Sequence, residues 1–151
     1  MEIDHIDRQI LQKLQQDASL GLEDLGDAVG LSRNACWRRV KILTDAKIIK
    51  SRVAILDAQK LNLNLTVFIS VRTNQHDPDW LDQFAKATRT MPEILGAYRM
   101  SGDLDYLIRA QVADMPAYDR VYQRLIKRIK LADVSASFVM EQIKETTALP
   151  L

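Results

Sequence analysis

The segment Gly30-Leu31-Ser32 constrains the fold more than any other part of this sequence, because it leaves only three residues between two helical patterns. Apolar residues recur every three or four positions on both sides of it, as an amphipathic helix requires. They are Leu22, Leu25 and Val29 before the segment and Cys36, Val40 and Leu43 after it. Glycine favours the left-handed conformation that ends a helix, and serine favours the position before a helix begins. The pattern predicts a helix over 22–29, a tight turn, and a second helix from Ser32 to about Ala46.

Another helix is predicted upstream, over residues 4–17. Its apolar residues have helical spacing, and acidic residues occupy its first turn, where the helix dipole favours them. The apolar residues are Ile6, Ile10, Leu11 and Leu14. Three helices, the last two joined by so short a turn, match the helix-turn-helix unit, whose last helix enters the major groove of DNA. Three-helix cores also occur in proteins that do not bind DNA. The charge distribution must therefore decide whether this unit binds DNA.

Charge is distributed unevenly over these helices, although the whole chain is almost neutral. Its 151 residues include 21 Lys and Arg and 20 Asp and Glu, so no overall field attracts a polyanion. Residues 1–32 carry two basic and seven acidic side chains, whereas residues 33–52 carry seven basic side chains and one acidic one. We therefore expect the cationic side chains between Arg33 and Arg52 to gather on the outward surface of the last helix and its trailing segment, facing a DNA duplex.

The outward side of this last helix carries side chains that suit a phosphate-lined groove. With the apolar stripe turned inward, a rotation of about 100° per residue places a polar and basic set outside, beside the helix amino terminus. The predicted DNA-binding residues are Ser32, Arg33, Asn34, Trp37, Arg38 and Lys41. Arginine pairs with guanine, asparagine with adenine, and lysine or a helix amino terminus with phosphate. A solvated basic helix is the alternative, and Trp37 fits either DNA contact or packing over the edge of the first helix.

The chain changes character near residue 53. Residues 52–56 alternate like a strand and form either a wing or a connecting strand, and residues 58–64 are a short link without glycine or proline. From about 65 to 146 the order is strand, helix, strand, strand, helix, strand, with the last strand over 134–144. This βαββαβ order is the ferredoxin-like arrangement. We predict an α+β protein with a winged helix-turn-helix domain at 1–52, a connection at 53–64 and a ferredoxin-like domain at 65–151.

One face of the predicted sheet has no helix to cover it, because both helices of a ferredoxin-like domain pack on the other face. Apolar residues interrupt the polar positions of this face at Phe68, Leu107, Val139 and Ile143. Apolar content on both faces of an antiparallel sheet favours burial against a second sheet. We therefore expect a homodimer, which presents two recognition helices to a two-fold DNA site.

The sequence also disfavours several classes of protein. Cys36 is the single cysteine, and His5 and His76 are the only histidines, so we expect no disulfide, no metal site and no cofactor. Residues 65–151 hold one histidine and no nucleophile beside a base, so we expect no catalytic residues and no enzyme activity. The first residues are acidic and the apolar runs are short, so we expect neither a signal peptide nor a membrane span, and a cytoplasmic location.

Four stretches of the chain form a recognisable set, at residues 4–11, 29–32, 36–43 and 101–106. Together they resemble the Lrp/AsnC (leucine-responsive, feast/famine) family of bacterial and archaeal transcription regulators. The pattern Gly102-Asp103-x-Asp105-Tyr106 is the most specific part, and the resemblance covers essentially the whole chain. The chain departs from the family at Asn34-Ala35, where many members have a small hydroxyl residue followed by proline. Because of this departure, the resemblance does not indicate which operator sequence the chain binds.

This resemblance implies a DNA-binding domain followed by a ligand-sensing domain, called RAM, that dimerises through its sheets and often assembles further into octamers or related rings. Family members bind amino acids at an interface between dimers, near the hairpin. Carried over to this chain, the effector-binding residues are Met100, Gly102, Asp103, Asp105, Tyr106, Met115, Ser137 and Val139. Residues 109–115 and 140–151 are similar to a proteobacterial branch that includes a cysteine-responsive regulator, which implies cysteine or another small amino acid as effector.

The hairpin also offers an amino-acid site on chemical grounds. Backbone N–H groups at Gly102-Asp103 would hold a carboxylate, and a nearby carboxylate such as that of Asp105 would take an ammonium group. The alternative is that Gly102 and Asp103 are only the turn residues a hairpin requires, with Asp105 a solvated charge. We expect a sequence-specific DNA-binding transcription regulator that responds to a small amino acid. The alternatives are an effector-independent DNA-organising protein and a small ferredoxin-like enzyme.

Overall fold

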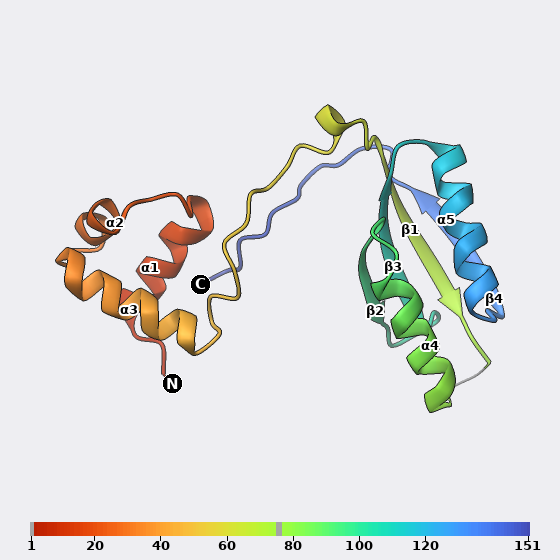
Figure 1. Ribbon diagram of the computed structural model, residues 1–151, viewed down its shortest axis with the longest axis horizontal. Coiled ribbons are helices and arrows are strands. Elements are labelled where there is room, and N and C mark those ends of the chain that lie inside the picture. Colours follow the sequence, from red (N-terminus) through yellow and green to blue (C-terminus); the bar gives the residue numbers. More distant parts are fainter. Residues whose placement is uncertain (1, 75–76) are drawn as a thin grey trace. The chain divides into compact units, whose positions relative to one another are not determined.

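The computed structural model describes residues 2–74 and 77–151. The chain divides into two compact units (Figure 1), Met1–Ile55 together with Lys144–Leu151, and Leu56–Ile143. From sequence we assigned the whole of 65–151 to the second domain, whereas the contacts group the last eight residues with the first unit. Their backbone bonds to Gln12 and Gln15 on the first helix, and no periodic pattern in the sequence signals such a contact.

The first unit contains the three predicted helices, α1 (His5–Gln16), α2 (Leu22–Ala28) and α3 (Arg33–Asp45). Their apolar stripes meet in one core, as the spacing predicted. The fully enclosed side chains are Ile10, Leu25, Cys36 and Leu43. Burial raises the pKa of the Cys36 thiol, so this residue packs as a small apolar group.

Two glycines shape the turn between α2 and α3. Gly30 has φ +71°, the left-handed conformation that ends a helix. Gly26 lies within α2 and faces the turn that follows the helix. A Cβ built at Gly26 would be 2.7 Å from the Leu31 carbonyl oxygen. Leu31 N–H in turn donates to the Gly26 carbonyl at 2.8 Å. The chain therefore folds back onto α2 so closely that a larger residue at 26 would clash.

The second unit is a four-stranded antiparallel sheet with α4 and α5 on one face (Figure 1). Its elements are η1 (Gln59–Leu61), β1 (Leu65–Arg72), α4 (Pro78–Arg89), β2 (Ile94–Arg99), β3 (Tyr106–Val112), α5 (Met115–Arg128) and β4 (Asp133–Phe138). The strand order β2-β3-β1-β4 confirms the ferredoxin-like arrangement. Ile69 and Ile108 from the sheet share one core with Phe84 of α4 and Leu125 of α5. Within the described residues, no helix combines the length and apolar character needed to cross a bilayer.

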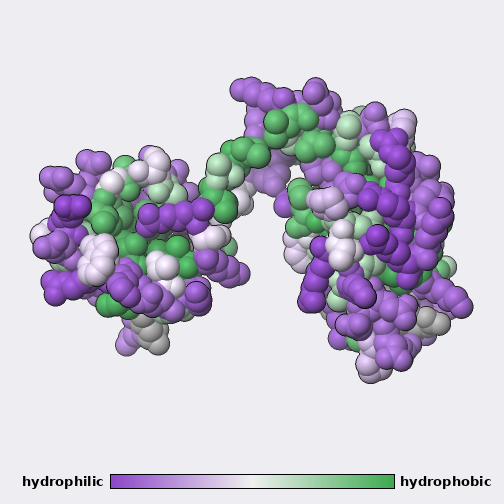
Figure 2. Space-filling model, viewed as in Figure 1, coloured by the Kyte–Doolittle hydropathy of each residue, from purple (hydrophilic) through white to green (hydrophobic). Residues whose placement is uncertain are grey.

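Two strand predictions were wrong. Residues 52–56 form no wing, because no strand of the described chain pairs with them, and Val53, Ile55 and Leu56 are at least 70% exposed. β4 ends at Phe138 rather than near 144, and residues 139–151 are without helix or strand. Alternating apolar residues make a strand only where a neighbour supplies hydrogen bonds. Figure 2 shows hydrophobic surface along the segment that joins the two units.

Candidate DNA interface and effector site

The first half of α3 is an exposed surface that carries the predicted DNA-binding set. Ser32 caps the helix by accepting the Ala35 N–H at 3.3 Å, so the first turn of α3 is fixed. Every member of the set is exposed: Ser32, Arg33, Asn34, Trp37, Arg38 and Lys41. Trp37 is 50% exposed, so much of its ring remains free of α1 and accessible to a ligand.

The cations of this surface differ in their partners. Lys41 Nζ lies 2.6 Å from Asp45 Oδ2, one helical turn away on the exposed surface. Such a pair contributes little stability, and a phosphate would replace the carboxylate readily. Arg33 and Arg38 form no ion pair within the part of the chain that the structure describes. Their guanidinium groups are therefore the cations most available to a polyanion.

Arg39 faces α1, contrary to the expectation that all cations between Arg33 and Arg52 face outward. Arg39 Nη1 lies 2.7 Å from Asp4 Oδ2 and 2.8 Å from Asp7 Oδ1. These carboxylates also cap α1, because Asp4 accepts the Asp7 N–H at 2.8 Å and Asp7 accepts the Asp4 N–H at 3.3 Å. The bond from the Asp7 N–H, followed by the Arg39 guanidinium, lowers the pKa of Asp4. Arg39 therefore ties α3 to the start of α1. The sequence shows the capping pattern but not a partner 32 positions away.

We expect Arg39→Ala to destabilise the first unit while leaving the exposed surface of α3 in place. The Asp7 side chain is only 7% exposed, so its carboxylate loses a donor that water replaces incompletely, at a cost of about 1 kcal/mol. Thermal unfolding should show a lower midpoint, and operator affinity below that midpoint should fall much less than for Arg38→Ala. A variant with an unchanged midpoint and lost affinity would instead assign Arg39 to the DNA interface.

Backbone hydrogen bonds shape the hairpin between β2 and β3. Met100 N–H donates to the Asp105 carbonyl at 2.8 Å, and Arg72 Nε donates to the Asp103 carbonyl at 2.8 Å. The Asp105 carboxylate accepts the Thr73 N–H at 2.9 Å. Asp105 is half-buried and structural, rather than a free solvated charge.

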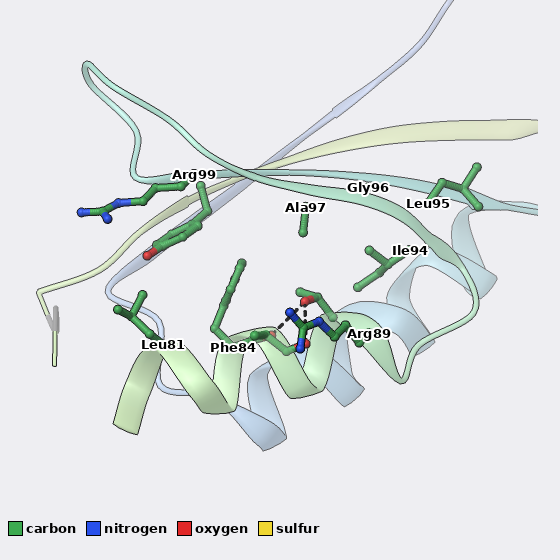
Figure 3. Close-up of a pocket in the computed structure, with 11 residues that line it drawn as sticks. Leu81, Phe84, Arg89, Ile94, Leu95, Gly96, Ala97 and Arg99 are labelled. Carbon is green, nitrogen blue, oxygen red and sulfur yellow. Dashed lines mark hydrogen bonds between the residues drawn. The ribbon is translucent and has the colours of Figure 1, made fainter. Parts of the chain in front are cut away.

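Tyr106 faces the core on the helix side of the sheet. It is 5% exposed, and its ring centroid lies 4.5 Å from that of Phe84 and 5.5 Å from that of Trp80. Beside it, an open hollow of about 420 Å³ separates α4 from β2 (Figure 3). Its apolar walls include Leu81, Phe84, Ile94 and Ala97. Tyr106 is the one predicted effector residue that lines this hollow, so the hollow is a feature that sequence reasoning missed and not the predicted site.

The predicted effector residues lie in two groups, one at the hairpin before β3 and one between the middle of the sheet and the other end of β3. One group is at the hairpin: Met100, Gly102, Asp103, Asp105 and Tyr106. The other begins at the middle of the sheet: Ser137 of β4 is level with Arg109, Val139 N–H donates to the carbonyl of Thr66, which pairs with Gln111, and Met115 follows β3. Tyr106 and Ser137 are separated by three residues along β3, roughly 10 Å, and by two strand spacings, also roughly 10 Å. One copy of the chain therefore does not bring the two groups together.

Two family models match the chain. An AsnC-type helix-turn-helix domain matches residues 3–44, and an Lrp/AsnC ligand binding domain matches residues 66–149. The chain belongs to the Lrp/AsnC family. It is accordingly a transcription regulator with a helix-turn-helix domain and a ligand-binding domain.

Several Lrp/AsnC relatives are similar over nearly their whole length. The DNA-binding transcriptional activator DecR of Escherichia coli is 47% identical over 99% of this chain and 99% of its own. A glutamate uptake regulatory protein of Zymomonas mobilis is 47% identical over 99% of this chain and 92% of its own. A transcriptional regulator from Neisseria meningitidis, solved with L-Met, has a TM-score of 0.93 and 37% identity, covering 99% of this chain and 97% of that one. These relatives are all regulators.

Proposed function

We propose that this Lrp/AsnC protein acts in the cytoplasm as a homodimer that places two copies of α3 in the major groove of operator DNA and responds to a small amino acid. The exposed first half of α3 supports the DNA-binding part of the proposal. There, Arg33 and Arg38 have no ion-pair partner among the described residues, and Asn34 lies beside them. Together with the helix amino terminus, these groups offer donors to phosphates and to base edges.

The uncovered face of the sheet supports the homodimer. Phe68 of β1 and Leu107 of β3 lie on the face opposite α4 and α5, and both are only partly exposed. Packing this face against the same face of a second copy removes apolar surface from water on both copies. A two-fold pair of sheets also gives the two α3 helices the symmetry of an operator with two half-sites.

The separation of the effector residues supports a ligand site between copies of the chain. Because three residues of β3 and two strand spacings already separate Tyr106 from Ser137, the hairpin meets Met115, Ser137 and Val139 only where another copy of the chain supplies them. We propose that dimers assemble into octamers to form this site. Met100 and Met115 are 40% and 52% exposed, and such flexible side chains adapt to an amino-acid side chain.

The relatives differ in the amino acids that their names mention, so the effector is proposed only by class. One relative regulates glutamate uptake, and another was solved with L-Met. We propose a small amino acid such as cysteine, whose carboxylate the hairpin N–H groups hold and whose ammonium group a carboxylate of the hairpin accepts.

Thermal unfolding with each of the twenty amino acids tests the effector part of this proposal. A ligand at a hundred times its dissociation constant adds about 2.7 kcal/mol to stability, so we expect one or a few amino acids to raise the midpoint by several degrees. Met115→Ala should reduce that shift, whereas Met140→Ala, at a residue 95% exposed and outside the predicted site, should keep it. If none of the twenty stabilises the protein, the effector-independent DNA-organising function takes its place.

A further inference from the structure

The last eight residues of the chain contact the DNA-binding unit, although the ligand-binding family model extends to residue 149. Gln15 of α1 makes two hydrogen bonds to Leu149: its Nε2 donates to the Leu149 carbonyl at 3.2 Å, and its Oε1 accepts the Leu149 N–H at 2.5 Å. One turn earlier on α1, Gln12 Nε2 donates to the Leu151 carbonyl at 2.9 Å. The end of the chain is therefore attached to α1 at two successive points.

The spacing of these contacts indicates an extended backbone at residues 149–151. Gln12 and Gln15 are three residues apart on one face of α1, and they bind residues two apart on the other segment, 149 and 151. Alternate residues point the same way only in an extended chain, so an extended segment presents both carbonyls to the same helix face. The Gln15 amide takes the N–H and the carbonyl of one residue, as a neighbouring strand would.

We propose that this segment, Lys144–Leu151, is a strap that gives the two units a second connection besides the one over residues 53–64, and so restrains the DNA-binding unit. The strap starts five residues after Val139, whose N–H donates to the Thr66 carbonyl on β1. At its other end it holds α1, which Arg39 ties to α3. This inference rests on the proposed function, because Val139 belongs to the proposed effector site and α3 to the proposed DNA interface.

The strap is held in a way that allows release. Leu149 is 69% exposed and Leu151 is 41% exposed, so neither side chain is enclosed in the core, and the three hydrogen bonds lie at the surface. Water competes for such exposed bonds, and segments with few buried contacts open first. A strap of this kind opens without unfolding either unit, and ligand contacts at Ser137 and Val139 act on the same stretch of chain.

Amide exchange tests the docking of the strap on α1 in the full-length protein without DNA. We compare the native protein with Gln12→Ala/Gln15→Ala and with the matched control Gln16→Ala, an exposed glutamine of the same helix with no hydrogen bond to the strap. We expect exchange at Leu149 to be roughly tenfold faster in the double variant and unchanged in the control. Equal exchange in all three proteins would overturn the docking.

Operator spacing tests the restraint. The two half-sites of a selected operator are moved apart by half a helical turn, about 5 base pairs. We expect the native protein and Gln16→Ala to bind this DNA much more weakly than the original, and Gln12→Ala/Gln15→Ala to discriminate several-fold less, with equal affinity for a single half-site. Unchanged discrimination after release of the strap would overturn the inference. Failure of the native protein to bind any operator would overturn the proposed function and leave the exchange result as it stands.

Discussion

Replacing Arg33 and Arg38 together with alanine lowers the affinity for operator DNA by roughly a hundredfold, while fold and dimer remain. Each arginine that pairs with a base edge or phosphate contributes about 1 to 3 kcal/mol, and 1.4 kcal/mol corresponds to a factor of ten. Both side chains are exposed, and neither takes part in an ion pair of the described chain, so their removal leaves no buried group without a partner. Fluorescence anisotropy with a labelled operator measures the affinity, and sedimentation checks the dimer.

A charge-matched variant separates a specific surface from net charge. Lys60→Ala with Lys86→Ala removes two exposed cations from the second unit. For the arginine variant, the slope of log affinity against log salt should become shallower by about 0.9 for each lost phosphate contact. The lysine variant should keep the native slope and affinity. If both variants weaken binding equally, the exposed surface of α3 has no special role.

The second large effect is expected from Gly26→Ala, which should destabilise the first unit although alanine is the better helix former. The gain in helix propensity is about 1 kcal/mol. Against it stands a Cβ that would be 2.7 Å from the Leu31 carbonyl oxygen, which is backbone and gives way only if the turn moves. Overpacking of this kind costs roughly 1 to 3 kcal/mol, so we expect a net loss. The displaced turn leads into α3, so operator affinity should fall as well.

Gly21→Ala is the control for this substitution. A Cβ at Gly21 would be 3.4 Å from the Asp24 carboxylate, an ordinary contact with a flexible side chain. Gly21 is the N-cap of α2, where alanine is less favourable than glycine, so chemical unfolding should show a small loss for Gly21→Ala and a clearly larger one for Gly26→Ala. A Gly26→Ala protein as stable as the native one would contradict the close approach of the turn to α2.

Regular elements could be predicted from sequence because local spacing determines them. The stripe of Cys36, Val40 and Leu43 predicted the buried face of α3, and Gly30 predicted the end of α2. The alternation over 52–56 predicted a strand wrongly, because a strand also needs a partner and local pattern carries no information about one. The same limit applies to Arg39 and to the strap, whose partners on α1 lie 32 and more than 130 residues away in sequence.

The effector residues were inferred from family resemblance, and the structure adds what that resemblance does not contain. It gives Asp105 a backbone partner at Thr73 and Tyr106 a place among aromatic core residues. It also separates the hairpin from Met115 by the length of β3, and from Ser137 by half that length and two strands. A single sequence shows neither which residues share an end of the sheet nor where a second copy docks, so this part of the site remains a prediction.

Quenching of tryptophan fluorescence by acrylamide tests the DNA-facing surface of α3 most directly. The chain has two tryptophans: Trp37, 50% exposed on α3, and Trp80, 3% exposed in the core of the second unit, so Trp37 dominates the quenching. A saturating amount of operator should shield Trp37 and lower the quenching constant toward that of a buried tryptophan. The same quenching constant in the free protein and in the saturated complex would contradict our assignment of this surface to DNA.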